Sequence, residues 1–131
     1  MRRIRPQPAA RTAGALLLAI GILGLVPAVT SGWSRLAFAG HGSDAKLVGV
    51  FRVSVLLDLF HVALGAAGLL LAGTAELARA YLLGAGIALI GLWALGVAKV
   101  GGWVPLSLAD NWLHLGLGVA LLGLARFTAE A

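Results

Sequence analysis

Two histidines, each preceded by an acid or an amide, are the residues of this sequence that could do chemistry. Asp58 and His61 lie three positions apart. Asn111 and His114 repeat that spacing 53 positions later, and Asp110 lies four positions before His114. Spacings of three and four bring side chains to one face of a helix. We therefore expect each acid or amide to meet its histidine, in an arrangement that suits hydrogen bonding, proton transfer or ligation of a cofactor.

A serine ahead of each group predicts where its helix begins. Ser54 suits an N-cap, and Ser107 with Asp110 matches the Ser-x-x-Asp capping pattern. Gly65 and Gly118 each follow a histidine by four positions. The chain therefore carries the same polar helix start twice, which predicts two repeated helical hairpins with the two histidines at equal depth.

The composition places these helices in a membrane. Of the 131 residues, 60% are hydrophobic and 11% are charged. A soluble domain of this size has too much surface to cover with so few polar groups. Nineteen glycines suit membrane helices, in which small residues let backbones approach closely. The chain has no cysteine, which excludes disulfides, thiolate chemistry and cysteine metal sites.

Four apolar runs predict an all-α integral membrane four-helix bundle. Each run approaches the roughly 20 residues that a crossing helix needs. We expect a basic cytoplasmic tail over residues 1–12, a membrane domain over 13–126 and a cytoplasmic C-terminal tail over 127–131. The expected spans are 13–30, 55–72, 80–100 and 108–125. Residues 46–51, in the longest connection, are expected to form a short interfacial helix.

Basic residues set the expected orientation. Four of the ten precede the first apolar run: Arg2, Arg3, Arg5 and Arg11. With Arg79 and Arg126 they outnumber the four basic residues of the opposite side, so both termini are predicted to be cytoplasmic. A secretory signal ending near residues 37–39 is the alternative for the first run, but that run is long for a signal core. No basic face exists elsewhere, so we expect no nucleic acid as a partner.

Three stretches of the chain resemble a known family. They are residues 51–65 (FRVSVLLDLFHVALG), 81–83 (YLL) and 105–118 (PLSLADNWLHLGLG), in which ADNWLH is the most specific string. They are similar to a family of small four-helix membrane proteins of high-GC Gram-positive bacteria, catalogued as a domain of unknown function (DUF4383). The resemblance extends over nearly everything after residue 12. It implies a four-helix fold in the bacterial cell (inner) membrane and no established activity.

Two functions without a cofactor are open for the polar cluster formed by Asp58, His61, Asp110, Asn111 and His114. The first expectation is a non-enzymatic structural or accessory protein, in which the cluster is interhelical hydrogen-bond glue. The second is a proton relay or small transporter subunit, since ionisable residues inside a membrane often mark ion pathways. Partners beyond the lipid bilayer would be a second copy of the chain or another membrane protein.

A third function is redox chemistry. His61 and His114, at equal depth on parallel helices, could ligate one haem b axially, with Gly65 and Gly118 leaving room for the macrocycle. No other metal site is expected. Hydrolytic chemistry is not expected either, because each capping serine lies two turns from its histidine.

Overall fold

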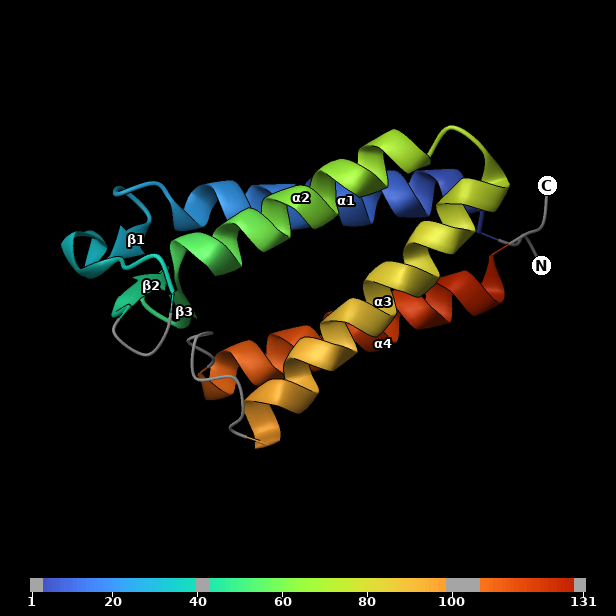
Figure 1. Ribbon diagram of the computed structural model, residues 1–131. Helices are drawn as coiled ribbons and strands as arrows, with labels where there is room; N and C mark the ends of the chain where they lie inside the picture. The colour runs from blue at the N-terminus through green and yellow to red at the C-terminus, as the bar shows by residue number, and fades with distance from the viewer. Residues whose placement is uncertain (1–3, 40–42, 99–106, 129–131) are drawn as a thin grey trace.

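The computed structural model describes residues 4–39, 43–98 and 107–128 (Figure 1). Four helices form most of it: α1 (Pro6–Gly24), α2 (Val55–Leu71), α3 (Ala75–Ala98) and α4 (Leu108–Phe127). The connection between α1 and α2 holds a short 3-10 helix, η1 (Trp33–Arg35), and a three-stranded antiparallel sheet of β1 (Thr30–Ser31), β2 (Ala45–Leu47) and β3 (Phe51–Val53). The predicted all-α four-helix class is confirmed, and the small sheet is an addition to it.

The helices form two hairpins. α1 packs along α2, and α3 packs along α4, while α1 and α3 join the two pairs (Figure 1). Ile4 and Thr128 form a parallel β-bridge, so both ends of the chain lie at one end of the bundle. The sheet lies at the opposite end, which we call the sheet end; the other is the terminal end.

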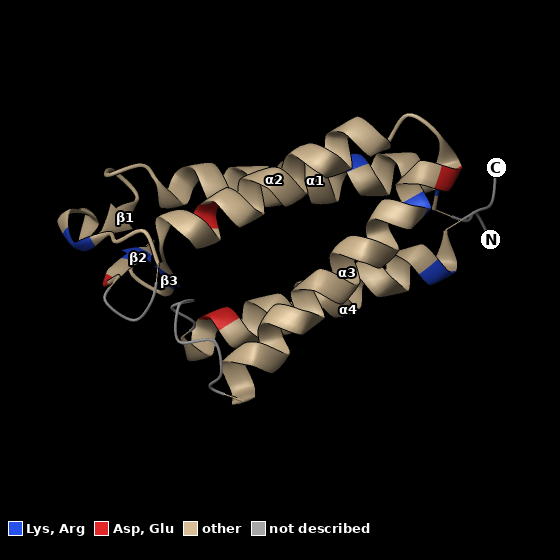
Figure 2. Cartoon of the chain, viewed as in Figure 1, with Lys and Arg blue, Asp and Glu red and all other residues tan. Residues whose placement is uncertain are grey.

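Three of the helices are long and apolar enough to cross a membrane: α1 with 19 residues, α3 with 24 and α4 with 20. α2 is also apolar but has only 17 residues, which gives a length of ~26 Å at 1.5 Å per residue. Charged residues lie toward the two ends of the helices and leave the middle without charge (Figure 2). Large apolar side chains such as Leu70, which is 82% exposed, cover the outer faces.

The first helix begins earlier than the sequence predicted. α1 starts at Pro6, although residues 6–12 were expected in the basic tail. Proline is tolerated there because the first N–H groups of a helix have no partner within it. α1 then ends at Gly24, ahead of Pro27, so residues 25–30 of the expected span form a turn and the start of β1.

The prediction of an interfacial helix over residues 46–51 is wrong, because this segment forms a β-hairpin. Ala45 pairs with Val53 and Leu47 with Phe51 across the turn. Val48 and Gly49 have φ angles of 47° and 73°, a left-handed conformation that reverses the chain. Ala45 and Leu47 point inward while Lys46 is exposed, which is the alternation of a half-buried strand.

Ser43 fastens this sheet to the segment that follows η1. Its Oγ donates to the Val53 carbonyl at 2.6 Å and accepts from the Ala37 N–H at 3.0 Å, and the residue is fully buried. Ser43→Ala is therefore expected to lower the free energy of unfolding by about 1 kcal/mol. Thermal unfolding of the purified protein measures the loss. Ser34→Ala, at an exposed position, is the control; equal effects of both changes would contradict the assigned role.

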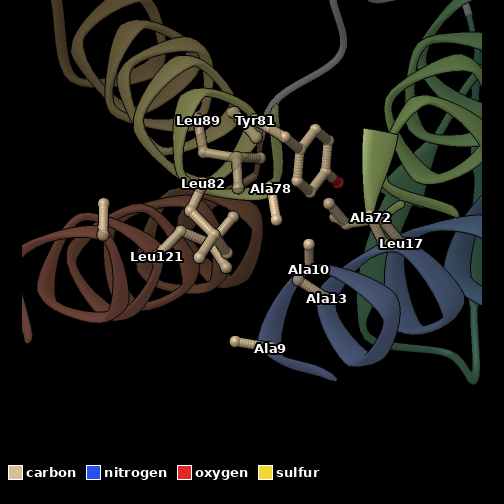
Figure 3. Close-up of a cluster of buried hydrophobic side chains, with 12 residues drawn as sticks. Ala9, Ala10, Ala13, Leu17, Ala72, Ala78, Tyr81, Leu82, Leu89 and Leu121 are labelled. Carbon is tan, nitrogen blue, oxygen red and sulfur yellow. The ribbon is translucent and has the colours of Figure 1, made fainter. Parts of the chain in front are cut away.

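Small side chains let the two hairpins meet. Ala10 and Ala13 of α1 lie opposite Ala78 and Tyr81 of α3 (Figure 3). Leucines fill the remaining space, and the most deeply buried are Leu17, Leu82 and Leu89. Without a hydrophobic driving force between helices in lipid, such close packing is the main source of association.

Candidate functional site

The two histidines meet directly. His61 Nε2 of α2 and His114 Nε2 of α4 are 3.3 Å apart, and both residues are buried. The ring centroids are 5.4 Å apart and the ring planes are tilted by 33°. One Nε2 must carry a proton and the other must accept it for this contact to be a hydrogen bond. As a hydrogen bond, this contact would join the first hairpin to the second through one shared proton.

Serines start both helices that carry the histidines. Ser54 Oγ accepts from the Leu57 N–H at 3.1 Å. Ser107 Oγ accepts from the Asp110 N–H at 3.2 Å, and the Asp110 carboxylate accepts in return from the Ser107 N–H at 2.8 Å. Each histidine lies seven residues beyond its cap, or about 10 Å along the helix. The two caps thus hold the histidines at matching depth.

Asp58 lies against α1 instead of bonding to His61. The carboxylate is fully buried and packs on Gly24, where an added Cβ would come within 2.7 Å of Oδ2. Neither of its oxygens has a hydrogen-bond partner among the described residues. The expected pairing of each acid with its own histidine is therefore not formed. Gly24 of α1 leaves space for the Asp58 carboxylate, and the capping bonds to Ser107 hold the Asp110 carboxylate.

Asn111 repeats this arrangement in the second hairpin. Its amide packs on Gly96 of α3, where an added Cβ would overlap it. Asn111 follows Asp58 by 53 positions, and Gly96 follows Gly24 by 72. The carboxylate of the first hairpin thus occupies the place that a neutral amide takes in the second.

The same two offsets relate most buried positions of the hairpins. Moving α2 by 53 residues pairs Leu57 with Asp110, His61 with His114, Gly65 with Gly118, and Gly68 with Leu121. Moving α1 by 72 residues pairs Pro6 with Ala78, Ala9 with Tyr81, Ala10 with Leu82, Ala13 with Ala85, Gly14 with Gly86, and Leu17 with Leu89. The connection between α1 and α2 is longer than the connection between α3 and α4 by the difference between the two offsets. This longer connection holds the sheet.

Arg52 links the polar cluster to the sheet. Its backbone N–H bonds to the Asp110 carboxylate, and its Nη2 lies 3.6 Å from Asp44 Oδ1. Asp44 also pairs with Arg35 at 3.6 Å. Arg52 and Gly24 were not expected as parts of the site, since the fold of the long connection brings Arg52 to α4 and the packing of α1 on α2 brings Gly24 to Asp58. In the sequence, nothing beyond the residue types of Arg52 and Gly24 indicates a role in the site.

The site leaves several buried polar atoms without a hydrogen bond among the described residues. They are both Asp58 oxygens, the Nδ1 atoms of His61 and His114, Asn111 Oδ1 and Arg52 Nε. Buried polar groups in proteins nearly always have a partner, in the protein or in ordered water. The Asp58 and Asp110 carboxylates also interact electrostatically across the gap between α2 and α4.

A haem does not fit between the histidines as they are placed. Two metal–imidazole bonds of roughly 2 Å would hold the Nε2 atoms about 4 Å apart with a metal between them. The two atoms instead contact each other. The glycines also leave no room for a macrocycle: Gly65 packs on the backbone of Gly14, and Gly118 packs on Ile90 and on the carbonyl of Gly86. The described part of the chain holds no group of three or more histidine or acidic side chains that could bind a metal ion.

Comparison with known proteins places the chain in a family. The family model described as "Domain of unknown function (DUF4383)" matches residues 7–127, which is nearly the whole chain. The chain belongs to the DUF4383 family. The resemblance found in the sequence is thereby confirmed, and the match covers the sheet and all but the first residue of the four helices of this DUF4383 protein. No curated protein and no solved structure matches the chain.

Asn111 of this DUF4383 protein has the same place in the second hairpin as Asp58 has in the first, so a neutral amide is compatible with such a position. Asp58→Asn is expected to raise the free energy of unfolding by about 1 kcal/mol, because it replaces a buried carboxylate without a described partner by the amide of the matching position. Asp110→Asn is expected to lower it by about 1 kcal/mol, since it weakens the capping box. Unfolding in mixed detergent measures both; a larger loss from Asp58→Asn than from Asp110→Asn would contradict this assignment.

Proposed function

We propose that this DUF4383 protein is a non-enzymatic, multi-pass protein of the bacterial cell membrane with a structural or accessory role. The supporting observation is the 3.3 Å contact between His61 Nε2 and His114 Nε2, which fastens one hairpin to the other. The matching burial of the hairpins supports their origin as two copies of one unit. In this role the polar cluster gives glycine-rich helices a fixed register, which apolar packing alone specifies weakly.

Genetic complementation tests the structural role. The variant with both His61→Gln and His114→Gln keeps a donor and an acceptor at each position. We expect it to fold to wild-type yield and to rescue any phenotype of a strain that lacks the gene. A variant that folds to wild-type yield and fails to rescue would contradict this role, because the chemistry of imidazole would then be required.

The proposed topology has four crossings and both termini in the cytoplasm. Arg5 precedes α1 and Arg11 lies in its second turn, while Arg79 bonds to the Ala125 carbonyl, next to Arg126 near the end of α4. These basic residues belong to the half of the bundle near the termini, which fits the positive-inside rule. α2 lies beside α1 along the bundle and completes the fourth crossing. Reporter fusions test the topology: a fusion at the C-terminus should report the cytoplasm, and one inserted at Gly49 should report the outside. The same compartment for both fusions would contradict it.

A proton relay is the second candidate, favoured by the Asp58 carboxylate. It is fully buried, without a described hydrogen-bond partner, and lies within electrostatic range of Asp110. Together with the histidine pair it supplies carriers for a proton in the half of the bundle near the sheet. Water molecules at the unpartnered atoms would connect them. A path across the whole membrane would further require a second copy or a partner protein against the exposed apolar faces.

Proteoliposomes with an internal pH dye test the relay. With an imposed membrane potential, the wild-type protein should acidify or alkalise the lumen faster than protein-free vesicles do. Asp58→Asn should abolish the difference, while Asp44→Asn, in the exposed ion pairs of the sheet, should preserve it. Equal flux in the wild type and in Asp58→Asn would remove this candidate.

A further inference from the structure

An open groove between α3 and α4 lies at the terminal end of the bundle. Its volume is about 460 Å³. The lining consists of four apolar residues and two arginines: Arg79, Ala80, Leu83, Leu122, Ala125 and Arg126. Ala80, Leu83 and Arg126 are exposed, so the groove opens to the outside of the bundle rather than toward the histidines. In a membrane this face meets lipid.

The two arginines border the groove in different ways. Arg79 of α3 donates from Nε and Nη2 to the Ala125 carbonyl of α4, at 3.3 Å and 3.2 Å. These bonds hold its guanidinium across the gap between the helices. Arg126 is exposed and lies 5.9 Å from the centre of the Phe127 ring. The rim thus carries one positive charge fixed in place and a second on a side chain able to reach a ligand.

Charge distinguishes this groove from a second apolar groove in the described part of the protein. The second groove, of about 380 Å³, runs between α1 and α4 and is lined by Ile4, Pro8, Thr12, Leu117 and further apolar residues, with no charged side chain. Glu76, in the first turn of α3, does not line the groove of Arg79 and Arg126. Only the groove between α3 and α4, among those described, joins an apolar channel to a basic rim.

We propose that the groove between α3 and α4 binds one anionic phospholipid. Its phosphate lies between Arg79 and Arg126, and an acyl chain follows Leu83 and Leu122 toward the middle of the membrane. Basic pockets between membrane helices on the cytoplasmic side recognise anionic headgroups in this way, and planar guanidinium groups suit phosphate oxygens. The lipid adds a contact across α3 and α4 at the end of the bundle opposite the histidine pair.

Thermal unfolding with defined lipids tests the proposal. Full-length protein in a neutral detergent is titrated with phosphatidylglycerol or phosphatidylcholine of identical acyl chains. Phosphatidylglycerol should raise the unfolding temperature saturably, and phosphatidylcholine should not. Inorganic phosphate should have no effect; protection by phosphate equal to that by phosphatidylglycerol would show a free-anion site and overturn the assignment of a lipid.

Variants locate the site. Arg126→Gln should weaken the apparent affinity for phosphatidylglycerol about tenfold, as expected for the loss of one charge-assisted contact. Arg11→Gln removes the same charge from α1, outside the groove, and should leave the affinity within about twofold. Leu83→Trp fills the channel and should block binding while the protein still folds. Equal losses in Arg126→Gln and Arg11→Gln, or undiminished binding by Leu83→Trp, would overturn the proposal.

Discussion

Replacing Gly14 with leucine is expected to lower the free energy of unfolding by at least ~3 kcal/mol and to prevent stable folding of part of the protein. A Cβ at this position would lie 2.7 Å from the Gly65 carbonyl oxygen and 3.0 Å from the Leu69 nitrogen. Both atoms belong to the backbone of α2, so no side chain can rotate away. The two helices would have to separate along the contact that holds the first hairpin together.

Gly91 provides the matched control for this change. It lies on the exposed side of α3, and an added Cβ would meet nothing within 4 Å. Gly91→Leu should therefore change the free energy of unfolding by less than about 0.5 kcal/mol, or raise it slightly through helix propensity. Unfolding in SDS, with the yield of monodisperse protein as a second readout, measures both variants. Equal stability of Gly14→Leu and Gly91→Leu would show that α1 and α2 do not approach as closely as described.

The second large effect is expected from His114→Leu. Leucine removes the partner of His61 Nε2 and leaves that nitrogen buried without a hydrogen bond among the described residues, a penalty of about 2 kcal/mol. His114→Gln restores a polar partner and should lose less than about 0.5 kcal/mol. His61→Leu combined with His114→Leu should lose less than the sum of the two single changes, since no unpaired nitrogen remains. Additive losses in this cycle would contradict a direct bond between the two histidines.

The repeated motif allowed the equal depth of the two histidines, but not their direct contact, to be expected from the sequence. Ser54 and Ser107 suit N-caps because their hydroxyls can accept from the first free N–H groups, and counting seven residues from each cap places His61 and His114 at one depth. The starts of α2 and α4 were accordingly placed within a residue of their positions. Local patterns of this kind are strong because they depend on neighbours in the chain.

Contacts between segments that are distant in the sequence could not be predicted from local patterns. The pairing of Asp58 with Gly24 depends on how α1 lies against α2, and nothing in the spacing around Asp58 reveals it. The β-hairpin at residues 45–53 was missed because its strands have three residues each and its turn begins with Val48, a β-branched residue that rarely adopts positive φ. Pro6 and Pro8 suggested an irregular tail, although proline is well suited to the first turn of a helix.

The most direct test of the account is nitrogen NMR of the histidine side chains in lipid nanodiscs. A hydrogen bond at the 3.3 Å contact requires that the two Nε2 atoms share one proton. We predict one protonated Nε2 and one unprotonated Nε2, with a coupling between them through the hydrogen bond that disappears in His61→Gln. Two protonated Nε2 atoms, or two histidine spectra that do not respond to each other's replacement, would contradict the joining of the two hairpins at His61 and His114.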